Sequence, residues 1–214
     1  MPTFNSPLKT CDECERLYLS ANSPMAALCP ECSHLLYGYE IQTPMSAKDK
    51  QKIFIKTYLK PTLKKWGYQT SGQKWWKDCG DFFIAIHLVN SSYNTRDEVR
   101  FHFAIGPVIK RDLSDPAKKK IAWRDMRFSH FDETAHMAEK QRNPFRRNNQ
   151  NIYILKDDTN LEDFLSEISL DFEKEVLTSL EKLQTLEDWV EFFERSSSLS
   201  GAQAAQYFRE KMST

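Results

Sequence analysis

The chain has 214 residues, of which 40% are hydrophobic, and its 30 Lys and Arg residues balance its 30 Asp and Glu residues. A zero net charge excludes a global electrostatic attraction to nucleic acid or to anionic membranes. Only six glycines argue against repeats and long flexible linkers, whereas fourteen Phe, eight Tyr and five Trp are ample for a hydrophobic core. We therefore expect one main domain with a small appendage.

Four cysteines near the N-terminus form two C-x2-C pairs, Cys11 with Cys14 and Cys29 with Cys32. Fourteen residues separate the pairs, which is a spacing typical of structural zinc sites. Four thiolates complete a tetrahedral shell and leave no open position for a substrate. The sequence therefore predicts one structural zinc ion, in a head whose folding depends on the metal.

Two disulfides are the alternative use of these cysteines. Residues 1–9 lack the apolar core and cleavage site of a secretory signal, and no run approaches the ~18 apolar residues of a membrane helix. We therefore expect a cytoplasmic protein that contacts no membrane, and in a reducing compartment paired cysteines more often bind metal. The fifth cysteine, Cys79, has no partner spacing and is predicted to be a partly buried, inert thiol.

The first helix is predicted to begin after Ser46, its N-cap. Residues 1–45 form the predicted zinc head, residues 46–195 an α+β domain, and residues 196–214 a tail helix. The apolar residues of the first helix share one face: Ile53, Phe54, Tyr58, Leu59, Leu63 and Trp66. Pro61 predicts a kink or a break into two short helices, and Gly67 predicts the helix end.

An antiparallel meander of strands is predicted next. Residues 68–77 form an aromatic hairpin around Ser71 and Gly72, residues 81–90 a central strand, and residues 100–110 an alternating strand. Residues 121–131 also permit a strand, and residues 152–155 form a last short apolar run.

The clearest helix is predicted after the cluster Asp157–Asn160, which supplies an N-cap. Its apolar residues keep 3.6-residue spacing from Leu161 to about Leu183. Residues 186–193 either extend the helical region or begin a second helix, and a tail helix covers residues 202–212. The fold class is therefore α+β, with an antiparallel meander flanked by an N-terminal helix and long C-terminal helices, and preceded by the zinc head.

Part of this pattern resembles the domain of unknown function 4304 family. The residues that carry the likeness are Leu59, Pro61, Leu63, Gly67, Tyr68, Trp75, Trp76, the strand Phe82–Val89, Phe101, Phe103, Ile105, Gly106 and the acidic helix after Asp157. The resemblance covers roughly the last three quarters of the chain. It implies a bacterial, mostly cytoplasmic α+β domain with no established activity. Some families of unknown function neighbour toxin–immunity loci. The zinc head departs from the simple form of the family.

The first functional hypothesis is a non-enzymatic module that binds an unknown protein partner. Two features motivate it: five tryptophans (Trp66, Trp75, Trp76, Trp123 and Trp189), and a basic stretch at 110–147 followed by an acidic one at 157–194. Each feature also has an ordinary interpretation, because tryptophans commonly fill cores and charged stretches commonly form solvated surfaces.

Nucleic-acid binding is the alternative hypothesis. Zinc knuckles often present basic side chains to phosphates, and the basic stretch supplies a phosphate track: Lys118, Lys119, Lys120, Arg124, Arg127, Arg142, Arg146 and Arg147. The acidic residues of the head, such as Asp12 and Glu13, argue against this hypothesis.

Catalysis is the third hypothesis. His130 and His136 could bind a second metal, with Asp132 or Glu133 as the base, and His87 and His102 lie on adjacent predicted strands. This spacing matches no established metallohydrolase motif, and the chain has no Gly-rich phosphate loop and no nucleophile elbow. The sequence therefore favours a protein that is not an enzyme.

Overall fold

The computed structural model describes residues 8–10, 17–19, 45–115, 120–126, 143–146, 152–195 and 199–213. The chain divides into two compact units, Met1–Pro44 and Met45–Thr214. In the first unit, strands β1 (Leu8–Thr10) and β2 (Leu17–Leu19) form an antiparallel pair in which Lys9 lies opposite Tyr18. The four cysteines predicted to bind zinc lie outside the described residues.

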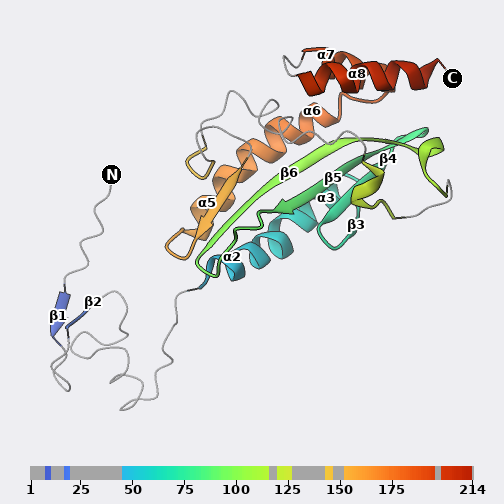
Figure 1. Cartoon of the computed structure of the whole chain (residues 1–214). Helices are drawn as coiled ribbons and strands as arrows, with labels where there is room; N and C mark the ends of the chain where they lie inside the picture. Colours follow the sequence, from blue (N-terminus) through green and yellow to red (C-terminus); the bar gives the residue numbers. More distant parts are fainter. Residues whose placement is uncertain are drawn as a thin grey trace. The chain divides into compact units, whose positions relative to one another are not determined.

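An antiparallel sheet of five strands is the centre of the second unit (Figure 1). Its strands follow one another in sequence order: β3 (Gln69–Ser71), β4 (Lys74–Asp78), β5 (Phe82–Asn90), β6 (Glu98–Ile109) and β7 (Tyr153–Lys156). Tight turns join β3 to β4 and β4 to β5, where Gly72 and Gly80 have φ angles of 66° and 84°. A positive φ is readily adopted by glycine. The predicted α+β class and antiparallel meander are confirmed.

The two faces of the sheet pack on different partners. Phe82, Ile84, Ile86 and Leu88 of β5 belong to the main core, which they share with the helices. The side chains between them, Phe83 and Ala85, join a smaller cluster on the other face. This split follows from the period-2 alternation of a strand. Both faces of β5 are therefore buried over most of its length, which explains its nearly continuous apolar sequence.

The N-terminal helical segment is α2 (Ala47–Ile53), the π-helix η2 (Phe54–Leu59) and α3 (Lys60–Lys65). Ser46 caps it as predicted, since its hydroxyl accepts a hydrogen bond from the Asp49 amide at 3.3 Å. The predicted break into two short helices at Pro61 is wrong, because helical backbone continues through this residue, and the alternative of a kink stays a prediction. Proline lacks an N–H and crowds the carbonyl four residues earlier, and the wider π-helical turn accommodates both defects.

The C-terminal part begins with α5 (Leu161–Ser169), which continues through the π-helix η6 (Leu170–Leu177) into α6 (Thr178–Leu180). Asn160 is the N-cap within the predicted cap cluster, and its side chain accepts hydrogen bonds from the amides of Glu162 and Asp163. Helices α7 (Leu186–Arg195) and α8 (Leu199–Met212) then pack against each other (Figure 1). Within the described ranges, no helix is both long and apolar enough to cross a membrane.

The strand proposed for residues 121–131 is wrong over its described part. Residues 123–125 form a 3-10 turn, η4, and the Ala122 amide donates to the Asp125 carboxylate at 2.6 Å. Another 3-10 turn, η3 (Lys110–Asp112), ends β6. Ile121 and Met126 are buried in the smaller cluster. These apolar residues therefore cover one face of the sheet without adding a strand to it.

The tryptophans mostly fill the core. The exposed fractions of Trp75, Trp76 and Trp189 are 1%, 4% and 0%, and Trp66 is half-buried against the main core. The side chain of Trp123 lies outside the described residues. At least three of the five tryptophans are therefore wrong as evidence for a partner-binding surface. They fill the core, as the ordinary interpretation expects.

Candidate binding site

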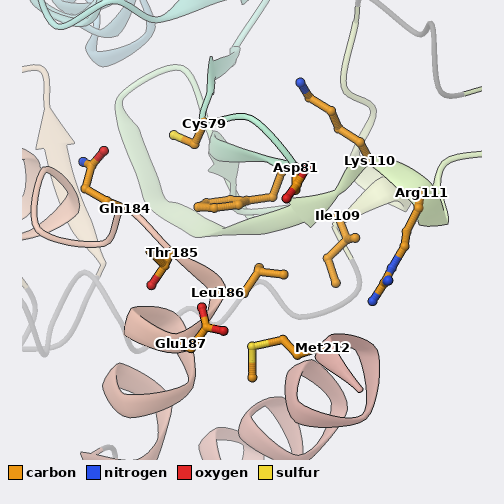
Figure 2. Close-up of a pocket in the computed structure, with 11 residues that line it drawn as sticks. Cys79, Asp81, Ile109, Lys110, Arg111, Gln184, Thr185, Leu186, Glu187 and Met212 are labelled. Atoms are coloured by element: carbon orange, nitrogen blue, oxygen red, sulfur yellow. The ribbon is translucent and has the colours of Figure 1, made fainter. Parts of the chain in front are cut away.

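A cleft of about 780 Å³ lies where the end of β6 and the turn before β5 approach the C-terminal helices. Its apolar lining comes from Phe82, Ile109, Leu186 and Met212. Its polar lining consists of Cys79, Asp81, Lys110, Arg111, Gln184, Thr185 and Glu187. Figure 2 shows Ile109, Leu186 and Met212 around one space, with Arg111 and Glu187 at its margins. The cleft is therefore apolar in its centre and charged around it.

Strand register and a capped turn position the two sides of this cleft. Phe82 lies directly opposite Ile109 in the sheet, so both side chains belong to its last row. Across the cleft, the amides of Gln184 and Thr185 donate to the Asp188 carboxylate at 2.9 and 2.8 Å. These hydrogen bonds lower the pKa of Asp188, with the Thr185 amide as the largest cause. The turn that carries Leu186 is therefore held as a capped helix start.

The charges around the cleft differ in how they are paired. The Lys110 ammonium forms an ion pair with the Asp78 carboxylate at 2.7 Å and lowers the pKa of that carboxylate. It also lies 4.7 Å from the centre of the Phe83 ring, in a cation–π contact. The exposed side chains of Asp81, Arg111 and Glu187 form no ion pair with any residue in the described part of the chain. Within the described part of the chain, these three cleft charges are therefore not neutralised by another side chain.

Cys79 is half-buried at one end of the cleft, as predicted. Burial raises the pKa of its thiol, although the nearby Lys77 opposes this effect. A cysteine nucleophile needs a lowered pKa, because the thiolate is the reactive form. The Cys79 thiol is therefore protonated near neutral pH, which agrees with an inert role.

A buried polar network ties the segment 143–146 to helix η6. The Oδ2 atom of Asp171 accepts hydrogen bonds from Asn143 at 2.8 Å and from Tyr153 at 3.1 Å, and lies 3.2 Å from Nε of Arg146. Asp171 is 0% exposed and Arg146 is 5% exposed. Burial raises the pKa of Asp171, and Arg146 opposes this shift. The prediction that Arg146 contacts phosphates is therefore wrong, because its guanidinium is buried against a carboxylate.

The rest of the predicted phosphate track is only partly described. Lys120 and Arg124 are exposed, whereas Lys118, Lys119, Arg127, Arg142 and Arg147 lie outside the described residues. Within the part of 110–147 that is described, Lys110 and Arg146 pair with carboxylates. Two of the described cations of this stretch are therefore compensated by carboxylates, whereas Arg111, Lys120 and Arg124 are exposed.

The two strand histidines lie on the sheet face opposite the main core. His87 pairs with Ala104 and His102 with Val89 across β5 and β6. Burial lowers the pKa of His87 to about 4, with a smaller contribution from Lys74, and burial also lowers the pKa of His102. His130, Asp132, Glu133 and His136 are not among the described residues. Across the described ranges, no group of three or more His, Cys, Asp or Glu side chains could hold a metal.

Sequence reasoning missed this cleft. Arg111, Leu186 and Met212 come from three distant segments, and none belongs to a recognisable motif. Asp171 did carry a cue, because it is an acidic residue one position before the buried Phe172 on the apolar face of a helix. A buried carboxylate requires a cation or hydrogen-bond donors nearby.

Comparison with known proteins gives one match. The family model described as "Domain of unknown function (DUF4304)" matches residues 59–182, which is more than half of the chain. A search of curated proteins and a search of solved structures found no match. The matched range contains the sheet and the Cys79–Arg111 side of the cleft, whereas Gln184–Glu187 and Met212 follow it.

Proposed function

The chain belongs to the DUF4304 family of domains of unknown function, and we propose that it is a non-enzymatic protein-interaction module. The cleft would receive a segment of a partner protein. One observation carries the proposal: an apolar centre formed by Phe82, Ile109, Leu186 and Met212 is surrounded by charges that have no ion-pair partner among the described residues. An immunity-like role in a bacterium is a narrower form of this proposal.

The chemistry of the cleft fits this role. Protein interfaces combine an apolar centre with a polar rim, and arginine is enriched in them. Arg111 can form a bidentate pair with a carboxylate of the partner, and Asp81 and Glu187 can bind its cations. The lining residue best suited to nucleophilic attack, Cys79, has a raised pKa. These properties support binding over catalysis.

A structural zinc ion in the first unit is part of the same proposal. Cys11 and Cys14 fall in sequence between the antiparallel strands β1 and β2, and Cys29 and Cys32 follow β2. A C-x2-C pair between two paired strands is a common arrangement in zinc ribbons. The four cysteines would hold the zinc, which would stabilise a unit too small for a large apolar core.

The test is a pull-down with the tagged full-length chain from its native host, with and without nuclease. The decisive variant is Arg111→Glu, which places a negative charge at the cleft. Arg124→Glu is the matched control, since this arginine is also exposed in the basic stretch but does not line the cleft. We expect a specific protein that survives nuclease, is lost from Arg111→Glu and is kept by Arg124→Glu.

Two results would contradict the proposal. A companion protein retained equally by both variants would mean that the cleft does not bind it. Companions that disappear on nuclease treatment would instead support the alternative, nucleic-acid binding through the zinc head and the 110–147 region.

A further inference from the structure

Five lysines recur at every fourth position of the N-terminal helical segment: Lys48, Lys52, Lys56, Lys60 and Lys64. We call them the lysine row. All five side chains are exposed, while Phe54, Leu59 and Leu63 of the same segment are fully buried in the main core. Lys50 does not belong to the row, because it is buried and its ammonium donates to the carbonyls of Asp157 and Thr159.

The π-helix η2 keeps the row straight. In an α-helix each residue turns by about 100°, so positions four apart drift around the axis by about 40° at every step. A π-helical turn contains more residues, and each residue therefore turns by less. Because η2 spans Phe54–Leu59, in the middle of the row, it reverses the drift between Lys52 and Lys60. The five lysines therefore follow one side of the helical segment. Figure 1 shows the backbone of this segment running along the sheet.

The positive charge of the row is poorly compensated by the residues that the structure describes. Residues 47–65 contain seven lysines and one acidic residue, Asp49, which lies 2.8 Å from Lys52. In the described ranges no carboxylate pairs with Lys48, Lys56, Lys60 or Lys64. Like charges four residues apart destabilise a helix. An anionic partner would relieve this repulsion.

The side chains around the row favour a polyanionic partner that binds through charge and needs no apolar contacts. The other exposed residues of the segment are Asp49, Thr57, Pro61 and Lys65, and its large apolar side chains are fully or partly buried. A membrane-surface helix would present Trp, Phe or Leu to the bilayer. A protein interface would present aromatic or arginine anchors, and lysine is depleted there. A nucleic-acid backbone requires only a line of cations.

We propose that the lysine row binds the sugar-phosphate backbone of a nucleic acid without reading its bases. Successive lysines in the α-helical parts are separated by about 6 Å, which spans roughly two phosphates at 3.4 Å per nucleotide of one strand. Such contacts fix position but carry no sequence information. The row lies outside the basic stretch 110–147, and the inference is independent of the cleft and of the zinc head.

The test is fluorescence anisotropy with the full-length chain and a labelled 20-base-pair duplex at several salt concentrations between about 50 and 200 mM. The row variant replaces Lys48, Lys56, Lys60 and Lys64 by Gln. The control variant replaces four exposed cations outside both the row and the 110–147 stretch by Gln: Lys156, Lys174, Lys182 and Arg195. Both variants lose the same charge, so any difference between them reports the position of the cations. A thermal melt verifies that each variant is folded.

We expect the row variant to bind at least about tenfold more weakly at low salt, with a slope of log K against log salt that is less steep by about 3 to 4. The control should bind like the natural chain, and a scrambled duplex should bind equally well. The proposal is overturned if the natural chain shows no salt-dependent binding or if both variants lose the same affinity. Tighter binding to vesicles containing phosphatidylserine than to the duplex would also overturn it.

Discussion

Burial of the Asp171 carboxylate costs free energy unless other side chains compensate for it. A fully buried carboxylate loses its hydration, and the loss is offset only by partners with good geometry. Here Asn143, Arg146 and Tyr153 all converge on one oxygen of the carboxylate. These partners come from two segments far from η6 in sequence. The network therefore specifies where residues 143–146 and β7 pack against the helix.

Replacing Asp171 by Asn should lower the free energy of unfolding by about 3 to 5 kcal/mol, because the buried Arg146 cation would lose the negative charge of this carboxylate. Chemical denaturation measures this change. Asp158→Asn is the control, since Asp158 is exposed and the substitution should cost within about 0.5 kcal/mol.

A double-mutant cycle tests the assignment of the pair. Arg146→Met combined with Asp171→Asn should cost clearly less than the sum of the two single substitutions, since the double variant leaves no buried charge unpaired. Additive costs would show that the two side chains do not interact.

At the scale of elements, the two π-helices follow the same apolar pattern. Ile53, Phe54, Tyr58 and Leu59 fall at relative positions 0, 1, 5 and 6. Phe172, Val176 and Leu177 repeat the last three of these positions, and the buried Asp171 occupies the first. Phe54 and Leu59 are both fully buried although they lie five positions apart. A π-helical turn places positions five apart on one face, which an α-helix does not. In each helical segment, the π-helix therefore coincides with buried residues that lie five positions apart.

The start of α5 depends on one side chain. The Asn160 carboxamide oxygen accepts from the amides of Glu162 at 2.9 Å and Asp163 at 3.3 Å. Asn160→Ala leaves these amides without the cap and should lower the free energy of unfolding by about 0.5 to 2 kcal/mol, measured by urea denaturation. Asn160→Asp should retain the stability, since it keeps an acceptor at the N-terminus of the helix. Equal losses in both variants would contradict a capping role.

At the scale of the whole molecule, the chain consists of two units with different expected sources of stability. The second unit has an extensive core shared by the sheet and the helices. The first unit, Met1–Pro44, is too short to build a large core, so the proposed zinc ion would replace one. Loss of the metal should therefore affect the two units unequally.

Cys14→Ser should abolish stoichiometric zinc in the purified chain, as measured by elemental analysis. The thermal transition of the second unit should remain, because its core contains none of the four cysteines. Cys79→Ser is the matched control and should keep its zinc, since Cys79 lies in the second unit and outside the proposed ligand set. A Cys14→Ser variant that still binds one zinc ion per chain would disprove the four-cysteine site.

The α+β class, the meander and the caps at Ser46 and Asn160 were predictable from the sequence, because they depend on local periodicity and capping chemistry. Three features depend on tertiary structure. Arg146 is read as a surface cation until Asp171 is placed beside it. Pro61 is read as a break until η2 is recognised. The cleft is assembled from β6, the turn before α7 and the end of α8. Sequence periodicity reports which face of an element is buried, whereas contacts between distant segments exist only after the elements have packed.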